Sequence, residues 1–235
     1  MNLSIIFPVY NESKRLKKLF NSIIRFNKNH IKNVNYIFVN DGSSDDSLKI
    51  IKNFKKINKN IKVFIFSYKK NLGKGFAIKT GIIKQSAEWI LTADVDLSVQ
   101  LEQLLNWKKK ILFSKNKLYV GSRNLPQSKV RVVFLRKFIG KIMTLLIYTI
   151  LKIKIKDTQC GFKLYHKSYI KKIFRDLSIK GYAHDVEIII KIKKKRINII
   201  ELPVNWSYKA GSKVNLLSDS IRFFLNIIYI RLSFK

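Results

Sequence analysis

The sequence predicts an α/β fold with a mainly parallel central sheet flanked by helices. Through residues 3–93, short apolar runs typical of buried strands alternate with segments whose apolar residues recur at helical spacing. This strand–helix–strand order favours a parallel sheet with helices on both faces. Polar clusters follow directly after three of the strands, which is where such sheets bind their ligands.

Two strand–helix pairs open the chain. Leu3 to Tyr10 is the first strand run, and Asn11 is placed to cap the helix that follows it. Val34 to Val39 is the second strand, and Ser44 is placed to cap the next helix, with acidic residues favourable in its first turn. The apolar positions of the first helix recur on one face: Leu16, Leu19, Phe20, Ile23 and Ile24.

Two further strands complete the first half. Ile61 to Phe66 is the third strand, and Glu88 to Ala93 is the fourth, with a helix that opens at Asn71 to Gly75 between them. Because parallel strands of one sheet end at the same edge, we expect the polar clusters to converge there. These clusters are Tyr10-Asn11-Glu12, Asp41-Gly42-Ser43 and Asp94-Val95-Asp96.

The second half has a different pattern. An apolar but basic helical stretch is expected over Val132 to Ile155, followed by a turn and a strand over Asp157 to Tyr165. Gly181 to Glu187 opens another helix, Ile197 to Pro203 forms the last strand, and an apolar segment covers Leu216 to Leu232. Since no repeat or linker-like segment interrupts the pattern, the whole chain is expected to form one domain.

The charge balance is extreme, with Lys+Arg 48 against Asp+Glu 14 and a formal net charge of +34. Such a charge favours a polyanionic partner, either nucleic acid or an anionic membrane surface. The lysines are spread through every segment rather than gathered in a tail. We therefore attribute at least half of the excess to compositional drift.

Cysteine and histidine usage limits the chemistry. Cys160 is the only cysteine, so an internal disulfide is impossible and a reducing compartment is expected. The three histidines are scattered and lack zinc-site spacing. No signal peptide is expected, and no uncharged stretch approaches the roughly 18 residues of a spanning helix. We therefore expect a cytoplasmic protein that lies peripherally on any membrane it meets.

Asp94 and Asp96 stand one residue apart at the end of a strand. Mg²⁺ and Mn²⁺ commonly take one or two carboxylates together with phosphate oxygens. The pair therefore indicates a metal that bridges the protein to a nucleotide diphosphate. Lys74 lies in a glycine-flanked loop at a helix start, a position suited to an anion.

Motifs along the chain resemble those of family 2 glycosyltransferases. In the first half they are Phe7 to Glu12, Asn40 to Asp45, Asn71 to Gly75 and Asp94 to Asp96, in the order and spacing of that family. The second half is similar to the dolichyl-phosphate β-glucosyltransferases, to which the dolichyl-phosphate mannose synthases are close relatives. The segments concerned are Asp157 to Lys163, Gly181 to Glu187, Pro203 to Trp206 and Gly211 to Val214.

The resemblance implies a GT-A nucleotide-binding fold and a metal-dependent hexosyltransferase. Such an enzyme moves a hexose, with inversion, from a nucleotide sugar to a polyprenyl phosphate. The resemblance favours UDP-glucose as the donor, with GDP-mannose as the alternative, and Mg²⁺ or Mn²⁺ as the cofactor. Within the single domain of residues 1–235, residues 1–125 would bind the nucleotide sugar and residues 126–235 would face the acceptor and the membrane.

The resemblance also assigns roles at the donor site. Asp94 would contact ribose or metal, and Asp96 would hold the metal. Ser98 stands where relatives often have glutamine as a further metal contact; here we expect it to cap the following helix. The residues expected to hold the nucleoside are Pro8, Tyr10, Glu12 and Asp41.

Further roles fall in the second half. Arg123 and Arg136 would bind phosphate, since a planar guanidinium suits phosphate oxygens. Lys213 lies in a loop that would close over the diphosphate. Asp157 is expected to organise the turn that follows it. Asp185 would position the acceptor or cap its helix, because a phosphate acceptor is already ionised and needs no strong base.

Two alternatives and one location remain open. A family 2 enzyme that acts on a glycan hydroxyl would need Asp185 as its base. A nucleic-acid binder would show salt-sensitive DNA binding instead of metal-dependent nucleotide binding; we expect no nucleic-acid partner, since no module for one is recognisable. The segments Val132 to Ile155 and Leu216 to Leu232 could lie in a membrane interface with their apolar faces down and their cations near lipid phosphates.

Overall fold

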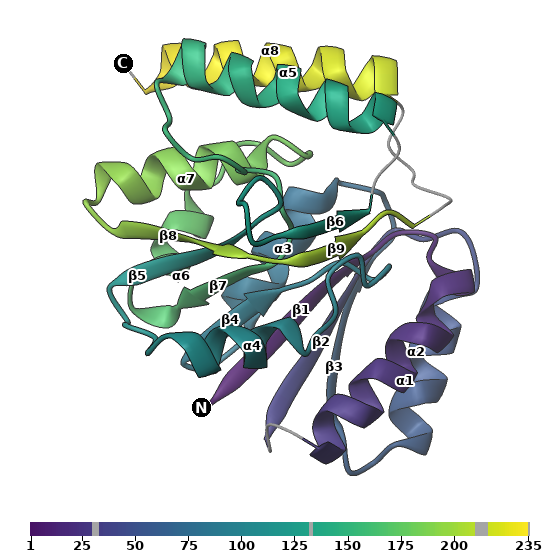
Figure 1. Ribbon diagram of the computed structural model, residues 1–235. Coiled ribbons are helices and arrows are strands. Elements are labelled where there is room, and N and C mark those ends of the chain that lie inside the picture. The colour runs from purple at the N-terminus through teal and green to yellow at the C-terminus, as the bar shows by residue number, and fades with distance from the viewer. Residues whose placement is uncertain (30–32, 132–133, 210–215, 235) are drawn as a thin grey trace.

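The computed structural model describes residues 1–29, 33–131, 134–209 and 216–234. Its centre is a seven-stranded sheet with the order β3-β2-β1-β4-β7-β5-β8, and a two-stranded sheet of β6 and β9 lies beside it (Figure 1). The strands are β1 Leu3–Val9, β2 Val34–Asp41, β3 Lys62–Tyr68, β4 Trp89–Thr92, β5 Lys117–Ser122, β6 Lys129–Arg131, β7 Lys163–His166, β8 Asn198–Pro203 and β9 Asn205–Ser207.

The predicted mainly parallel sheet is confirmed. β1 pairs in parallel with β2 and β4, β2 with β3, and β5 with β8. β7 alone runs antiparallel to both of its neighbours in this sheet, with Thr92 opposite Lys163 and Val120 opposite the same residue. The reason is geometric: the chain leaves the sheet after Ser122 and re-enters beside Gly121, whose N–H donates to the Phe162 carbonyl at 2.9 Å. A strand that starts at the edge where its neighbours end must run the other way.

Helices cover both faces of the sheet, as expected (Figure 1). Alternate residues of β1 divide between two cores: Ile5 packs with α1, α2 and α4, whereas Ile6 packs with α3, α6 and α7. A third core joins α5 and α8 to α7, on the side away from the sheet. The helices are α1 Ser13–Asn29, α2 Ser47–Ile57, α3 Lys74–Lys84, α4 Gln103–Lys110, α5 Phe134–Leu151, α6 Lys167–Arg175, α7 His184–Lys194 and α8 Leu216–Ser233.

The predictions that Asn11 and Ser44 cap helices are wrong, and Asp45 caps both helices instead. Asn11 has a φ of 53°, and its Oδ1 accepts from the backbone N–H of Ser44 at 2.7 Å, so it ties two loops together. Asp45 accepts from the N–H of Ser13 at 3.0 Å through Oδ2 and from the N–H of Ser47 at 3.0 Å through Oδ1. One carboxylate therefore satisfies the first amides of both α1 and α2.

We expect Asp45→Ala to destabilise the fold by about 2 kcal/mol, since a lost cap costs roughly 1 kcal/mol and two are lost. Burial alone would raise the pKa of Asp45, but hydrogen bonds from Ser47 and Ser13 lower it to about 2. Because the pKa of Asp45 is lower in the folded than in the unfolded protein, its ionised carboxylate stabilises the fold at any pH above the unfolded-state pKa. The loss of unfolding free energy in Asp45→Ala should therefore be constant above about pH 4 and shrink as the pH falls toward 2. Urea unfolding across that range measures it.

Asp46→Ala is the matched control, because Asp46 precedes α2 but makes no side-chain capping bond. Equal losses in the two variants, or a loss for Asp45→Ala that persists unchanged at pH 2, would contradict the capping role.

Candidate active site

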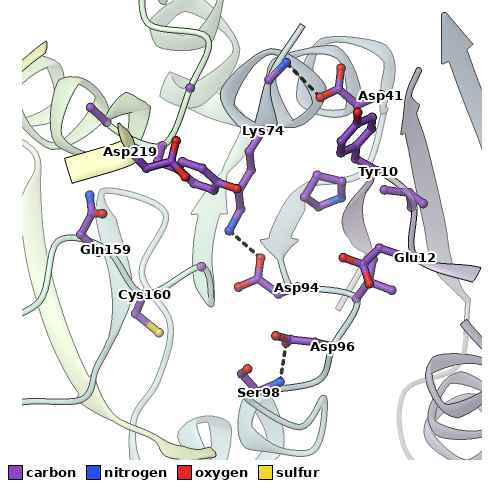
Figure 2. Close-up of a pocket in the computed structure, with 18 of the residues that line it drawn as sticks. Tyr10, Glu12, Asp41, Lys74, Asp94, Asp96, Ser98, Gln159, Cys160 and Asp219 are labelled. Carbon is purple, nitrogen blue, oxygen red and sulfur yellow. Dashed lines mark hydrogen bonds and ion pairs between the residues drawn. The ribbon is translucent and has the colours of Figure 1, made fainter. Parts of the chain in front are cut away.

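The carboxyl edge of the sheet opens into a cleft of about 520 Å³. The three predicted polar clusters do converge there: Tyr10 and Glu12 after β1, Asp41 at the end of β2, and Asp94 and Asp96 after β4 all line it (Figure 2). Segments from the second half close the other side, namely Gln159–Gly161, Gly181–Ala183 and the first turns of α8.

Carboxylates gather in this cleft although the chain has few of them. Of the 14 acidic residues in the sequence, five line the cleft. In a protein with a net charge of +34, solvated carboxylates gain no electrostatic stabilisation from lying close to one another. Their grouping here therefore marks a site for a cation or for ligand hydroxyl groups that donate hydrogen bonds. The five are Glu12, Asp41, Asp94, Asp96 and Asp219.

Asp94 and Lys74 face each other at the centre of the cleft (Figure 2). The Lys74 Nζ lies 2.6 Å from Asp94 Oδ1. Burial lowers the pKa of Lys74, but Asp94 and Asp185 outweigh it and raise that pKa above its ordinary value, so Lys74 is a fixed cation. Gly161 leaves room for the carboxylate, because a Cβ there would lie 2.5 Å from Asp94 Oδ2.

Asp96 is held by the turn after β4. Its Oδ1 accepts from the backbone N–H of Ser98 at 2.8 Å, and Leu97 between them has a φ of 53°. Ser98 is not the predicted helix cap, since α4 begins at Gln103 and has Glu102 at its N-cap. Ser98 instead lines the cleft beside Asp96.

The residues present fit a divalent cation that is shared with a ligand. Asp94 and Asp96 supply hard oxygen donors into an open cleft. No group of three or more His, Cys, Asp or Glu side chains capable of holding a metal occurs among the described residues. A metal held by two carboxylates would need oxygens from a diphosphate and from water to complete its coordination, which is how Mg²⁺ is commonly bound.

Asp41 organises the loop that presents Lys74. Its carboxylate accepts from the N–H groups of Leu72 at 2.7 Å and Gly73 at 2.9 Å, and from Asn71 Nδ2 at 3.0 Å. Gly73 has a φ of 100°, and a Cβ there would lie 2.6 Å from the Lys180 carbonyl oxygen, so glycine is required. The predicted contact between Asp41 and the nucleoside stays a prediction beside this observed role in the loop.

The remaining donor-site residues lie along β1 and its loop. Pro8 and Tyr10 line the cleft, and Tyr10 is half-exposed. Glu12 also lines it and holds Arg15, whose Nη1 lies 3.0 Å from Glu12 Oε2. An exposed aromatic ring beside hydrogen-bonding side chains suits a nucleoside base and its ribose.

Arg123 lines the cleft but is clamped by Asp157. Its Nε and Nη2 donate to the two Asp157 oxygens at 2.7 and 2.9 Å, and its guanidinium lies 5.5 Å from the ring centroid of Trp206. Asp157 also accepts from the Gln159 N–H at 3.1 Å, so it organises the turn as predicted. Burial lowers the pKa of Arg123, but Asp157 outweighs it, and the pKa lies above its ordinary value.

Asp185 lies behind the cleft and is not among the residues that line it. It is buried, and its Oδ1 is 2.5 Å from the Nζ of the fully buried Lys163. Burial raises the pKa of Asp185, but His184, Lys163 and Lys74 outweigh it and hold the pKa below its ordinary range. Asp185 lies in the first turn of α7 and forms a buried ion pair, so its predicted role in positioning the acceptor stays a prediction.

Two predicted phosphate-binding residues fall outside the description of the site. Arg136 belongs to helix α5, but its side chain is outside the described part of the chain, and Lys213 lies entirely outside it. Their roles stay predictions.

Sequence reasoning missed several residues that line the cleft. From α8 these are Asp219, Arg222, Phe223 and Asn226, which recur at helical spacing and so share one face. That spacing was available in the sequence, but a polar residue on an amphipathic helix ordinarily faces solvent. Gln159 and Tyr182, inside motifs that were recognised, line the same cleft.

The fold, a mainly parallel α/β sheet with a carboxylate-lined cleft at its carboxyl edge, matches that of GT-A glycosyltransferases. The chain belongs to Glycosyl transferase family 2, whose family model matches residues 4–174. Solved structures of glucosyl-3-phosphoglycerate synthase from Mycobacterium tuberculosis share the fold. One, in complex with Mn²⁺, UDP-glucose and phosphoglyceric acid, is 17% identical with a TM-score of 0.67, covering 99% of this chain and 79% of that one.

Curated relatives narrow the comparison. The chain is 33% identical over 241 residues to the dolichyl-phosphate beta-glucosyltransferase of Dictyostelium discoideum, covering 97% of this chain and 73% of that protein. It is 32% identical over 254 residues to the enzyme of the same name from Saccharomyces cerevisiae, covering 99% and 75%. It is 31% identical over 244 residues to dolichyl-phosphate beta-glucosyltransferase ALG5D of Trichomonas vaginalis, covering 99% and 74%.

Proposed function

We propose that this glycosyltransferase moves glucose from UDP-glucose to a polyprenyl phosphate, with Mg²⁺ or Mn²⁺ as cofactor. The proposal rests on one observation above all: Asp94, Asp96, Lys74 and Arg123 meet in a single cleft. The similarity to three proteins named dolichyl-phosphate beta-glucosyltransferases, over nearly the whole chain, supports the choice of sugar and acceptor.

The donor would be activated at its diphosphate. When bound by Asp94 and Asp96, a divalent metal supplies Lewis-acid neutralisation of the leaving diphosphate. Lys74 and Arg123 add fixed positive charge in the same cleft, where preorganised cations stabilise the charge that develops on the leaving group. The Asp41 bonds to the loop and the Asp157 clamp hold those two cations in place before the donor arrives.

A phosphate acceptor suits the absence of a base at Asp185. An acceptor phosphate carries an anionic oxygen and can attack the anomeric carbon directly, which inverts its configuration. A hydroxyl acceptor needs a carboxylate to take its proton. Asp185, the base which that alternative requires, is paired with Lys163 and lies behind the cleft wall. The geometry therefore favours the phosphate.

We expect UDP to bind more tightly than GDP in the presence of Mn²⁺, because the similarity points to the glucosyl branch of the family. Titration calorimetry with each nucleotide measures this, and repeating it with a chelator tests for the metal. A clear preference for GDP would instead assign the protein to the mannosyl branch and make GDP-mannose the donor.

We also propose that α5 and α8 rest on the cytoplasmic face of a membrane. None of the helices in the described ranges combines the length and apolarity that a bilayer crossing requires. The two helices lie side by side at one end of the molecule (Figure 1) and pack inward through Ile147, Phe223 and Ile227. Their outer surface exposes large apolar side chains: Ile142, Leu145 and Tyr148 of α5, and Ile221, Phe224, Leu225, Ile228, Tyr229 and Leu232 of α8.

This outer surface has the character of an interfacial helix pair. Lys141, Arg222 and Arg231 are exposed beside the apolar side chains, so cations and apolar groups can meet lipid phosphates and acyl chains together. A polyprenyl phosphate is itself anchored in a bilayer. Helix α8 carries both part of this outer surface and several residues that line the cleft. Binding of α8 to the membrane would therefore bring the active site close to the acceptor.

We expect the protein to sediment with anionic vesicles at low salt, and less so at high salt, because screening weakens its attraction to lipid phosphates. Leu225→Glu should reduce sedimentation by roughly tenfold, since it places a charge in the apolar surface. Ile57→Glu, at an exposed apolar position on α2, is the control and should sediment like wild type. Wild type that stays in the supernatant at low salt would rule out docking by this chain alone.

A further inference from the structure

The cleft has two opposed walls. Figure 2 shows Tyr10, Glu12 and Asp41 on one side, Gln159 and Asp219 on the other, and Lys74 with Asp94 between them. The first wall consists of residues from the ends of β1 and β2 and from the loop after β1, whereas the second is built from the segment before β7, from residues 181–183 before α7 and from α8. In the proposed function the first wall holds the nucleoside and the centre holds the diphosphate.

A nucleotide sugar is a linear molecule with its diphosphate in the middle. If the diphosphate lies at Lys74 and Asp94 and the nucleoside at Tyr10, the sugar must extend past the centre toward the second wall. Gln159 and Asp219 line that second wall, on the far side of Lys74 and Asp94 from Tyr10 (Figure 2).

Gln159 presents an unused donor at this wall. Its Nε2 is buried and has no hydrogen-bond partner among the described residues, although Gln159 lines the cleft. Buried amide donors are ordinarily satisfied, so one that is left open at the edge of a cleft indicates a ligand acceptor atom. Its backbone N–H donates to Asp157 at 3.1 Å, which fixes the point from which the side chain extends.

Helix α8 adds two more polar groups. Asp219 and Asn226 are seven residues apart, two helical turns, and both line the cleft. A carboxylate and an amide are suited to the vicinal hydroxyls of a sugar, each of which donates and accepts. Tyr182 lines the cleft, is 39% exposed and offers an apolar ring face to the C–H groups of a pyranose.

We infer that Gln159, Tyr182, Asp219 and Asn226 form the subsite for the donor's hexose and determine which hexose is accepted. The inference rests on the proposed function, since it takes the sugar of a nucleotide donor as the ligand. Glucose has all of its ring hydroxyls equatorial, so side chains around the ring edge can pair with them while a ring face stacks on Tyr182. An epimer with one axial hydroxyl would leave one of these groups unpaired.

The test compares ligands as well as variants. Calorimetry with Mn²⁺ measures the affinities of the full chain for UDP, UDP-glucose and UDP-galactose. We expect wild type to prefer UDP-glucose over UDP-galactose by at least about tenfold, the discrimination expected from one lost buried hydrogen bond. Asp219→Asn, Asn226→Leu and Gln159→Leu should each reduce that preference to about threefold or less and leave the UDP affinity within about twofold.

Asn198→Leu, at an exposed position on β8 outside the cleft, is the matched control and should keep the wild-type preference. The binding of UDP alone tests the proposed function separately from the subsite. If wild type shows no metal-dependent binding of UDP, the proposed function itself is wrong. If UDP binds but the three variants keep the wild-type preference, or if wild type does not distinguish the two sugars, the subsite is wrong. Thermal unfolding of each variant separates lost recognition from lost folding.

Discussion

Replacing Asp96 by alanine is expected to abolish sugar transfer, a loss on the order of 10³-fold or more, while the fold remains intact. Asp96 lies in the turn after β4, and among the described residues its carboxylate accepts a hydrogen bond only from the nearby backbone N–H of Ser98. Its removal leaves the strand register and the core untouched. It also removes one of the two carboxylates that follow β4, and with it much of the capacity to hold a cation against the leaving diphosphate.

Activity and metal binding should change together. Asp96→Ala should lose the metal-dependent part of UDP binding in calorimetry and keep the thermal unfolding temperature of wild type. Asp176→Ala removes an exposed carboxylate at the end of α6, away from the cleft, and should behave as wild type in both assays. Transfer by Asp96→Ala within about threefold of wild type at saturating metal would exclude Asp96 as a metal ligand.

Lys163→Met is expected to destabilise the fold by roughly 3–5 kcal/mol, the usual cost of removing one partner of a buried ion pair. The Lys163 side chain is completely buried, and its Nζ donates to the Cys160 carbonyl at 2.6 Å as well as pairing with Asp185. The variant would leave the Asp185 charge buried without its closest cationic partner, the Lys163 Nζ at 2.5 Å. Urea unfolding with a constant m-value measures the loss.

A double variant separates the charge from the packing. Lys163→Met with Asp185→Leu removes both charges and should recover most of the stability, since apolar replacements of buried pairs are often close to neutral. If Lys163→Met alone unfolds within about 1 kcal/mol of wild type, the pair is not isolated from solvent, and Asp185 becomes available again as a base for a hydroxyl acceptor.

The strands of the first half could be predicted closely. β1 to β4 begin and end within two residues of the apolar runs in the sequence. β1, β2 and β4 are central strands buried on both faces, so they must be continuously apolar, and the polar residues that follow them mark where each strand ends. The same logic explains why the polar clusters after β1, β2 and β4 meet in one cleft.

Other parts of the fold depend on contacts between distant segments, which a local sequence pattern cannot predict. The direction of β7 follows from where the chain re-enters the sheet after α5, which is a property of the tertiary path. β6 and β9 have three residues each, too short for a periodicity to be detected. Asn11 and Ser44 have the residue types of helix caps. Asp45 instead accepts the hydrogen bonds from the first residues of both α1 and α2, because the two loops are adjacent in space.

The site shows the same division. Sequence motifs were enough to predict that Asp94, Asp96 and Lys74 belong to the site. The contacts that hold other residues around them in place come from segments distant in the sequence. The clamp of Arg123 by Asp157 and the pairing of Lys163 with Asp185 join residues 34 and 22 positions apart. A buried ion pair and a catalytic carboxylate look alike in a sequence, so Asp185 could be assigned only once its burial was known.

One measurement tests the central claim most directly. Purified protein is incubated with Mn²⁺, UDP-glucose labelled in its sugar, and vesicles that contain either polyprenyl phosphate or the corresponding polyprenol, and the label in the organic phase is counted. The account predicts label in the lipid phase with the phosphate only, and none when a chelator replaces the metal. Label transferred to the polyprenol, or no lipid-phase label with the phosphate while GDP-mannose supports transfer, would contradict it.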